Sequence, residues 1–204
     1  MKYPGFAYAC LVLSVLCASA AVSADKITDG FEYKSMKELQ AKWTVRTSGF
    51  PKPPEVKLTT TTVKEGKKAL LISMPAVGAD GTPRLDLDIY PDMPMRLVKQ
   101  VNFWVYIENP QDIVQTGIHI GDATWANHYA KFGLIANVKG WQRVLVSTES
   151  LAAGAGKPTM DTVNQMRITF WFARGTKPAK IAFDDVIWST KQERDQRLNK
   201  KWYE

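Results

Sequence analysis

Short stretches in which apolar and polar residues alternate recur along the chain, and turn residues separate them. Alternation with a period of two predicts β-strands, and many short strands joined by turns predict an all-β sandwich or barrel. The predicted strands are residues 57–63, 69–74, 84–89, 100–107, 115–121, 129–135, 141–147, 166–172 and 180–188.

Two segments have a helical pattern instead. Residues 35–43 begin with Ser35, a good helix cap, and carry apolar residues at helical spacing. The tail, residues 191–204, contains five basic and three acidic residues and forms either a surface helix or a frayed end. We therefore expect one short N-terminal helix and a charged tail around a β-domain that covers residues 25–190.

The first 24 residues have the pattern of a signal peptide. Lys2 is the only charge, an apolar run follows over residues 6–21, and small residues precede Asp25. We predict cleavage after Ala24 and a secreted or periplasmic protein. Cleavage removes both cysteines, Cys10 and Cys17, which excludes a disulfide framework, a cysteine nucleophile and a thiolate metal site. It also removes Lys2, so 26 basic and 20 acidic residues leave a net charge of +6 instead of +7.

Several motifs follow one another in a familiar order. Asp29-Gly30-Phe31-Glu32 precedes a TTTVxEGKKAL hairpin, then come FWVYI, a Lys139-Gly140-Trp141 turn and a last strand that ends in FDDV. In this order the chain resembles a carbohydrate-binding-module jelly roll of the galactose-binding-domain-like superfamily, over roughly residues 28–188. The resemblance implies an antiparallel two-sheet jelly roll and a secreted, non-catalytic protein that binds a polysaccharide on its concave sheet.

The resemblance places residues 84–89, 115–121, 129–135 and 166–172 together in that concave sheet. Alternation sends Leu85, Leu87 and Ile89 inward and Asp86 and Asp88 outward. Aromatic rings and paired donors and acceptors suit sugars, whose C–H faces stack and whose hydroxyls form hydrogen bonds. The residues we expect to bind the ligand are Arg84, Asp86, His119, Trp125, His128, Tyr129, Arg167 and Trp171, with Lys131 and Asn127 nearby and Ala130 and Phe132 facing inward. In the same outward set, Gly117 and Gly121 would leave room for the ligand.

The same outward residues have a second interpretation. Arg84, Asp86 and Arg167 would also suit cross-strand ion pairs on an ordinary solvated sheet. Residues 100–107 are apolar on both faces, so we expect the 35–43 helix or the tail to cover Trp104 and Tyr106. Trp43 and Trp141 are expected in the core, and Trp188 and Trp202 are left undecided.

The resemblance also implies one structural calcium ion. Glu32 and Asp184 would supply carboxylates, and main-chain oxygens near Lys64 would complete an oxygen shell that suits a hard cation. Lys67 and Lys68 compete with this interpretation, because an ammonium could neutralise the same carboxylates. The alternative is a buried carboxylate paired with lysine or a hydroxyl.

The sequence gives little support for catalysis. Asp86 and Asp88 lie on one face of one strand, with their Cα atoms about 6.5–7 Å apart, and would flank a cleft poorly. Jelly-roll polysaccharide lyases use His and Tyr, but His119 and Tyr129 are only ten positions apart, so we regard the match as accidental. The remaining alternative is an envelope or extracellular assembly protein that binds another protein through the same fold and its tail.

The expected partner is a polysaccharide or glycan, and the positive charge favours an anionic one. Scattered lysines and the export signal argue against nucleic acid.

Overall fold

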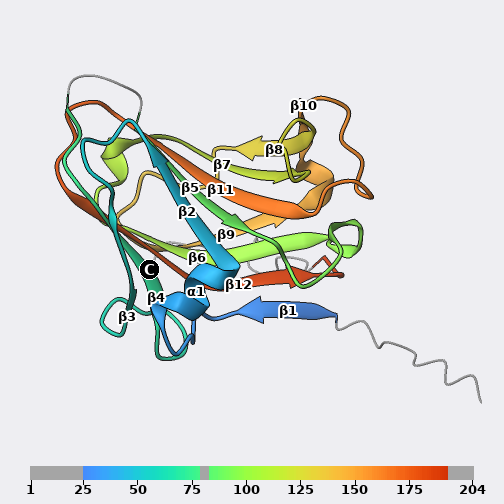
Figure 1. The fold of residues 1–204 in the computed structure, drawn as a ribbon, viewed down its shortest axis with the longest axis horizontal. Helices are drawn as coiled ribbons and strands as arrows, with labels where there is room; N and C mark the ends of the chain where they lie inside the picture. The colour runs from blue at the N-terminus through green and yellow to red at the C-terminus, as the bar shows by residue number, and fades with distance from the viewer. Residues whose placement is uncertain (1–24, 79–82, 193–204) are drawn as a thin grey trace, which may run out of the picture.

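The computed structural model describes residues 25–78 and 83–192, and its ribbon is a two-layer β-sandwich (Figure 1). The predicted signal peptide and most of the tail lie outside the described residues, so the predictions for them stay predictions. In the described part of the chain, no helix is long and apolar enough to cross a membrane. The helix and strands are α1 (Met36–Lys42), β1 (Lys26–Asp29), β2 (Trp43–Ser48), β3 (Glu55–Thr59), β4 (Ala69–Met74), β5 (Arg84–Ile89), β6 (Gln100–Ile107), β7 (Ile113–Gly121), β8 (His128–Phe132), β9 (Gly140–Ser147), β10 (Ala152–Ala155), β11 (Gln165–Phe172) and β12 (Ala179–Ser189).

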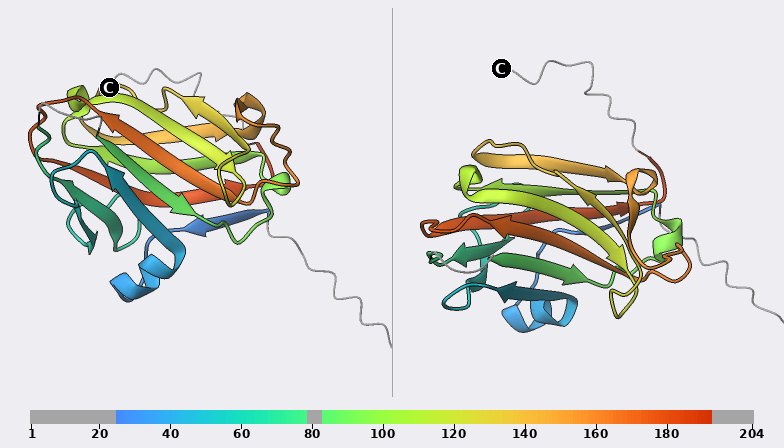
Figure 2. Two further views of the ribbon diagram at one scale, coloured as in Figure 1. Left: turned by 45° about the horizontal axis from the view of Figure 1, so that its top comes forward. Right: turned by 90° about the horizontal axis from the view of Figure 1, so that it is seen from above.

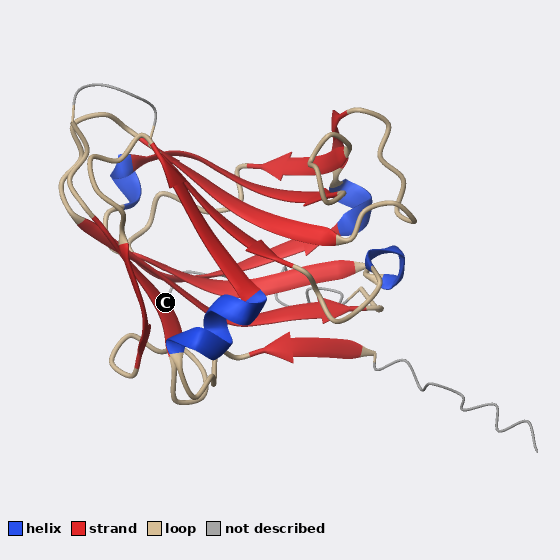
Figure 3. Ribbon diagram, in the orientation of Figure 1, coloured by secondary structure: helices blue, strands red, loops and turns tan. Residues whose placement is uncertain are grey.

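The strands form two antiparallel sheets, which Figure 3 shows as two red layers. Sheet A has the order β3-β4-β12-β6-β9, and β1 pairs with the second half of β12. Sheet B has the order β10-β8-β7-β11-β5-β2. The predicted all-β two-sheet sandwich is thus confirmed, and each of the nine predicted strands corresponds to an observed strand. Strands β1, β2 and β10 were not predicted.

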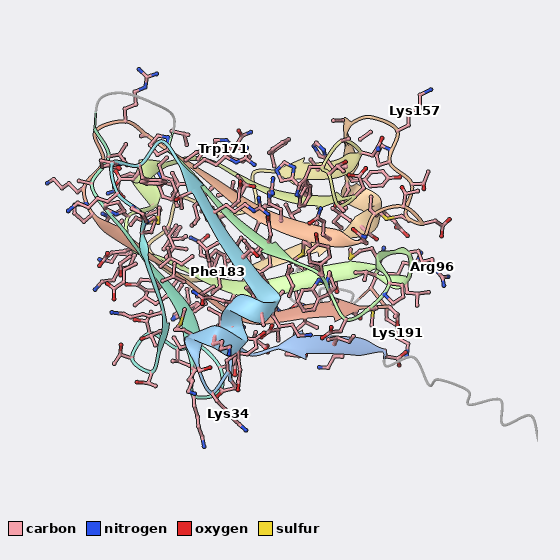
Figure 4. The ribbon with its side chains drawn as sticks, in the orientation of Figure 1. Lys34, Arg96, Lys157, Trp171, Phe183 and Lys191 are labelled. Atoms are coloured by element: carbon pink, nitrogen blue, oxygen red, sulfur yellow. The ribbon has the colours of Figure 1, made fainter. Side chains whose placement is uncertain are left out.

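The core lies between the sheets and is built from the apolar half of each alternating strand. Leu85 and Leu87 of β5 and Ile168 of β11 are fully buried, as the alternation predicts. The ring of Phe183, on β12, joins the two layers, because its centroid lies 5.7 Å from that of Phe170 on β11. Figure 4 labels Phe183 in the interior and Trp171 at the upper surface.

The short helix closes one edge of the sandwich. Ser35 caps it by accepting a hydrogen bond from the Glu38 amide, as the sequence predicts. Its Leu39 is buried, and Trp43 follows directly with only 1% of its surface exposed. The Trp43 indole packs 5.3 Å from Phe31, and its Nε1 donates to Asp29 at 2.7 Å. Trp43 is therefore the core residue that was expected, and Trp188, 6.4 Å away, joins it.

The helix packs at the sandwich edge, beside β2, and does not cover the outer face of β6, so this part of the expectation is wrong. The tail, the other expected cover, lies mostly outside the described residues. Trp104 is covered partly by Lys64, whose Nζ lies 4.4 Å from the ring centroid. Tyr106 packs instead against Trp141, with ring centroids 5.7 Å apart. Trp141 is thus partly exposed on this outer face and is not a core residue, because it pairs across the strands with outward Tyr106.

Candidate functional site

The outer surface of sheet B brings together most of the side chains that the sequence singles out. Residues that pair across antiparallel strands share a face, and β11 pairs with β5 on one side and β7 on the other. Figure 2 shows these strands side by side. We use the name ligand face for the outward residues of sheet B and the adjoining 122–127 loop; its members are Arg46, Arg84, Asp86, Asp88, His119, Trp125, His128, Phe132, Arg167, Thr169 and Trp171.

Two buried carboxylates form the polar floor of the ligand face. Asp88 accepts two hydrogen bonds from Arg167, at 2.6 and 2.8 Å, and Arg46 Nε lies 3.1 Å from Oδ2, one of the two oxygens that Arg167 contacts. Asp86 accepts from Arg84 Nε and from the Thr169 hydroxyl, both at 2.8 Å. The ion pairs that the sequence offered as a second interpretation therefore exist, although Arg167 pairs mainly with Asp88.

The ion pair of Arg167 is the most enclosed of these. Burial lowers the pKa of the Arg167 guanidinium, but the hydrogen bonds and charge of Asp88, with the charge of Asp86, outweigh it and raise the pKa overall. Arg167 is therefore a fixed cation, held in one orientation by a two-point contact.

A strip of rings lies beside this charged floor. Phe132 lies 5.5 Å from His119 and 6.0 Å from Trp171, measured between ring centroids. His128 continues the strip 5.4 Å from His119. Phe132, the last residue of β8, keeps 48% of its surface exposed, which is unusual for a large apolar residue. The strip is therefore an aromatic surface that is open at Phe132, where an apolar ligand face can pack, while His119 lies lower and is buried.

The 122–127 loop places a second tryptophan at the end of the strip. Asp122 accepts hydrogen bonds from Thr124 and from the amide and side chain of Asn127. These contacts lower the pKa of Asp122 to about 2. The loop turns at Trp125, whose φ is 62°, and the Trp125 ring lies 4.1 Å from the Arg167 guanidinium. Each tryptophan of the face therefore has an arginine beside it, since Arg84 lies 5.5 Å from Trp171.

His119 is neutral at physiological pH and lacks a partner at Nε2. Burial, followed by the charges of His128, Arg84 and Arg167, lowers its pKa to about 4. Among the described residues, nothing forms a hydrogen bond with His119 Nε2, although the atom is buried. His119 therefore packs as a neutral ring, and its Nε2 is buried and unpaired among the described residues.

The predicted orientation of residues 129–132 is wrong. The register of β8 against β7 pairs Phe132 with Gly117 and Ala130 with His119, so both point outward, while Tyr129 pairs with inward Ile120. Tyr129 packs against the core, and its hydroxyl donates to the Pro158 carbonyl at 2.8 Å. Lys131 also pairs on the inner side, with Ile118, and bonds Ser150. Tyr129 therefore does not belong to the ligand face.

Two glycines make the aromatic strip possible. A Cβ on Gly117 would lie 3.0 Å from the Phe132 ring, and one on Gly121 would lie 2.5 Å from the Trp125 ring. The rings of the ligand face fill the space that these glycines leave. The expectation that this space would accommodate a ligand is therefore wrong. The rings can consequently lie low against the sheet.

Seven of the eight predicted ligand residues come together on the ligand face: Arg84, Asp86, His119, Trp125, His128, Arg167 and Trp171. Their contact with a ligand stays a prediction. Sequence reasoning missed Phe132, Asp88 and Arg46. Alternation already places Asp88 on the outward face, so it could have been predicted as a member of the site. Residues 43–48 show no strand pattern, so nothing in the sequence was a reason to place Arg46 there.

Glu32 and Asp184 meet at the turn over residues 64–68. Glu32 Oε1 accepts from the amides of Lys67 and Lys68, at 2.5 and 3.0 Å, and these bonds lower the pKa of Glu32. Asp184 Oδ2 accepts from the amides of Lys64 and Glu65, at 2.8 and 2.9 Å. The two carboxylates therefore anchor the same turn.

The fit of this turn to calcium depends on Asp184. Burial raises the pKa of Asp184, and its Oδ1 is buried without a hydrogen-bond partner in the described part of the chain. An unpartnered carboxylate oxygen suits a hard cation, so the donor set fits calcium at this atom. Within the described ranges no three His, Cys, Asp or Glu side chains gather, so main-chain oxygens would have to complete the shell. Calcium stays a prediction.

The arrangement also bears on catalysis. His119 and Tyr129, the pair that a lyase would need, point to opposite sides of sheet B. Asp86 and Asp88 are both engaged by guanidinium groups. These residues are thus arranged to hold a surface together and do not converge on a reacting atom.

Comparison with known proteins identifies the fold. No protein-family model and no curated protein sequence matches the chain. The family 11 carbohydrate-binding module from Clostridium thermocellum, solved with a β-1,3-1,4-mixed-linked tetrasaccharide, is similar with a TM-score of 0.52 and 14% identity over 80% of this chain and 95% of that one. CBM27-1 from Caldicellulosiruptor saccharolyticus, solved with mannohexaose, has a TM-score of 0.51 and 14% identity over 84% and 100%. A glycoside hydrolase domain of Endo-D from Streptococcus pneumoniae R6 has a TM-score of 0.50 and 13% identity over 74% of this chain, but only 22% of that one.

The chain therefore has the jelly-roll β-sandwich of carbohydrate-binding modules, which confirms the expected resemblance.

Proposed function

We propose that this protein is a secreted or periplasmic, non-catalytic carbohydrate-binding protein that holds a polysaccharide on the ligand face. The observation that carries the proposal is the aromatic strip of Phe132, His119 and Trp171, which is exposed at Phe132 and flanked by arginines. Sugar rings stack their C–H faces on such rings, and guanidinium groups donate to their oxygens. The jelly-roll neighbours that were solved with oligosaccharides support the same function.

The length of the strip favours a chain of sugars over a single one. Trp125 stacks near Arg167, and Trp171 lies four positions further along β11, a distance of about 13 Å in an extended strand. A ligand that touches both tryptophans must therefore be extended along the strand. The location outside the cytoplasm is supported by the signal-peptide pattern of residues 1–24.

Affinity gel electrophoresis against a panel of soluble polysaccharides tests the function, with Trp171→Ala as the test variant. Loss of a stacking ring should weaken binding roughly tenfold or more. Trp141→Ala, a partly exposed tryptophan on the other sheet, is the matched control and should bind like the parent protein. Unchanged migration of the parent protein in every gel would contradict the function, and equal binding by both variants would contradict the site.

A further inference from the structure

The charges of the ligand face are layered. The side chains of Asp86 and Asp88 are only 12% and 5% exposed, whereas those of Arg46 and Arg84 are 64% and 34% exposed. A ligand that approaches this face therefore meets guanidinium groups and rings, while the carboxylates lie beneath them.

The two exposed guanidiniums have donors to spare. Arg84 contacts Asp86 through Nε, and Arg46 contacts Asp88 through Nε, in the part of the chain that the structure describes. A guanidinium carries five N–H donors in a planar fork, so the Nη groups of both arginines remain for a ligand. The carboxylates beneath them already accept hydrogen bonds from Arg84, Arg167 and Thr169, so they have less capacity to bind a ligand.

The positive charges of the ligand face also act on His119, which is neutral. The charges of Arg84 and Arg167 contribute to the lowered pKa of His119, after burial and the charge of His128. The same field that disfavours a proton on His119 attracts an anion to the surface.

We infer that the ligand face selects an acidic polysaccharide, one whose sugar rings carry carboxylate groups, with Arg84 and Arg46 as the specificity-determining residues. This inference rests on the proposed function and deepens it. A carboxylate matches the guanidinium fork in a two-point contact, and the rings beside it hold the sugar body. The three arginines of the face are paired with only two aspartates, so a sugar carboxylate would balance the remaining positive charge.

Isothermal titration of the full-length mature protein with polygalacturonate tests the inference, with carboxyl-reduced polygalacturonate as the matched ligand. We expect binding to the acidic polymer, at least tenfold weaker binding to the reduced one, and loss of affinity as salt rises from about 20 to about 200 mM. Arg84→Gln and Arg46→Gln should each weaken binding to the acidic polymer about tenfold. Lys57→Gln makes the same charge change on sheet A and should leave binding unchanged.

The outcomes separate the inference from the function on which it rests. Equal affinity for the reduced polymer, or for neutral mixed-linked glucan or mannan, with no salt dependence would overturn the acidic specificity and leave carbohydrate binding intact. Binding to sulfated glycans alone would overturn the carboxylate assignment. Failure to bind any glycan would overturn the proposed function itself. The control is the melting temperature of each arginine variant. If it equals that of the parent protein, a loss of affinity is not due to a loss of fold.

Discussion

Single residues on the ligand face serve both its stability and its surface chemistry. Asp88 is the clearest case, since its two oxygens hold Arg167 from below and its side chain is almost fully buried. Replacement of one partner in a buried ion pair leaves the other charge without compensation, and this costs several kcal/mol. The same contact fixes Arg167 beside Trp125, so it also shapes the surface that meets the ligand.

Asp88→Asn should therefore lower the free energy of unfolding by about 3 kcal/mol. Urea denaturation followed by far-UV circular dichroism measures this change. Glu55→Gln removes the acidic partner of an exposed pair with Lys57, and it should change stability little. Equal stability of the two variants would contradict the buried role of Asp88.

His119 predicts a specific dependence of stability on pH. Its pKa is about 4 in the folded protein and about 6.5 in the unfolded chain, so the unfolded state binds more protons between these values. Stability should consequently fall as pH is lowered from about 6.5 to about 4, by up to roughly 3 kcal/mol from this residue alone. At pH values above about 6.5 its contribution is constant.

The measurement is the difference in unfolding free energy between the parent protein and His119→Gln across this pH range. The carboxylates titrate in both proteins, so their contributions to the free energy of unfolding cancel in the difference. The parent protein should lose stability relative to the variant as pH falls from about 6.5 to about 4. Parallel profiles would show that His119 is not buried as a neutral ring.

At the scale of elements, strict alternation predicted strands and their faces where one face is clearly apolar. β5 and β11 follow this rule, and their outward residues are those expected. β8 does not, because Ala130 and Phe132 are apolar yet point outward, and the pattern alone places them inside. Their true orientation depends on the register with β7, where Gly117 opposite Phe132 leaves space for its ring. Register and edge packing are tertiary properties, which also explains why the 35–43 helix was wrongly expected to cover β6.

The turn over residues 64–68 is the element on which the calcium prediction can be tested. A cation bound to the folded state raises the melting temperature by mass action. We expect about 2 mM Ca²⁺ to raise the melting temperature by several degrees relative to EDTA, and Glu32→Gln to reduce this response. Glu55→Gln, on neighbouring β3, should respond like the parent protein. Identical melting curves in Ca²⁺ and EDTA would contradict the calcium site.

At the scale of the whole molecule, one continuous core joins the two sheets, and residues from all parts of the described chain contribute to it. β12 lies at the centre of sheet A, where it pairs with β1, β4 and β6. Its Phe183 contacts Phe103 within sheet A and Phe170 across the sandwich. The ligand face rests on the opposite side of β11, so its rings and charges depend on the same core.

Phe183→Ala should therefore destabilise the whole molecule as one unit. Loss of a fully buried phenylalanine costs about 3–5 kcal/mol, because it leaves a cavity between the sheets. Guanidinium unfolding monitored by far-UV circular dichroism and by tryptophan fluorescence should give coincident transitions in the parent protein, shifted together in the variant. The fluorescence reports both buried Trp43 and surface Trp171, so it samples the core and the ligand face at once. Separate transitions would mean that the molecule does not unfold as one unit, and the dependence of the ligand face on the shared core would be contradicted.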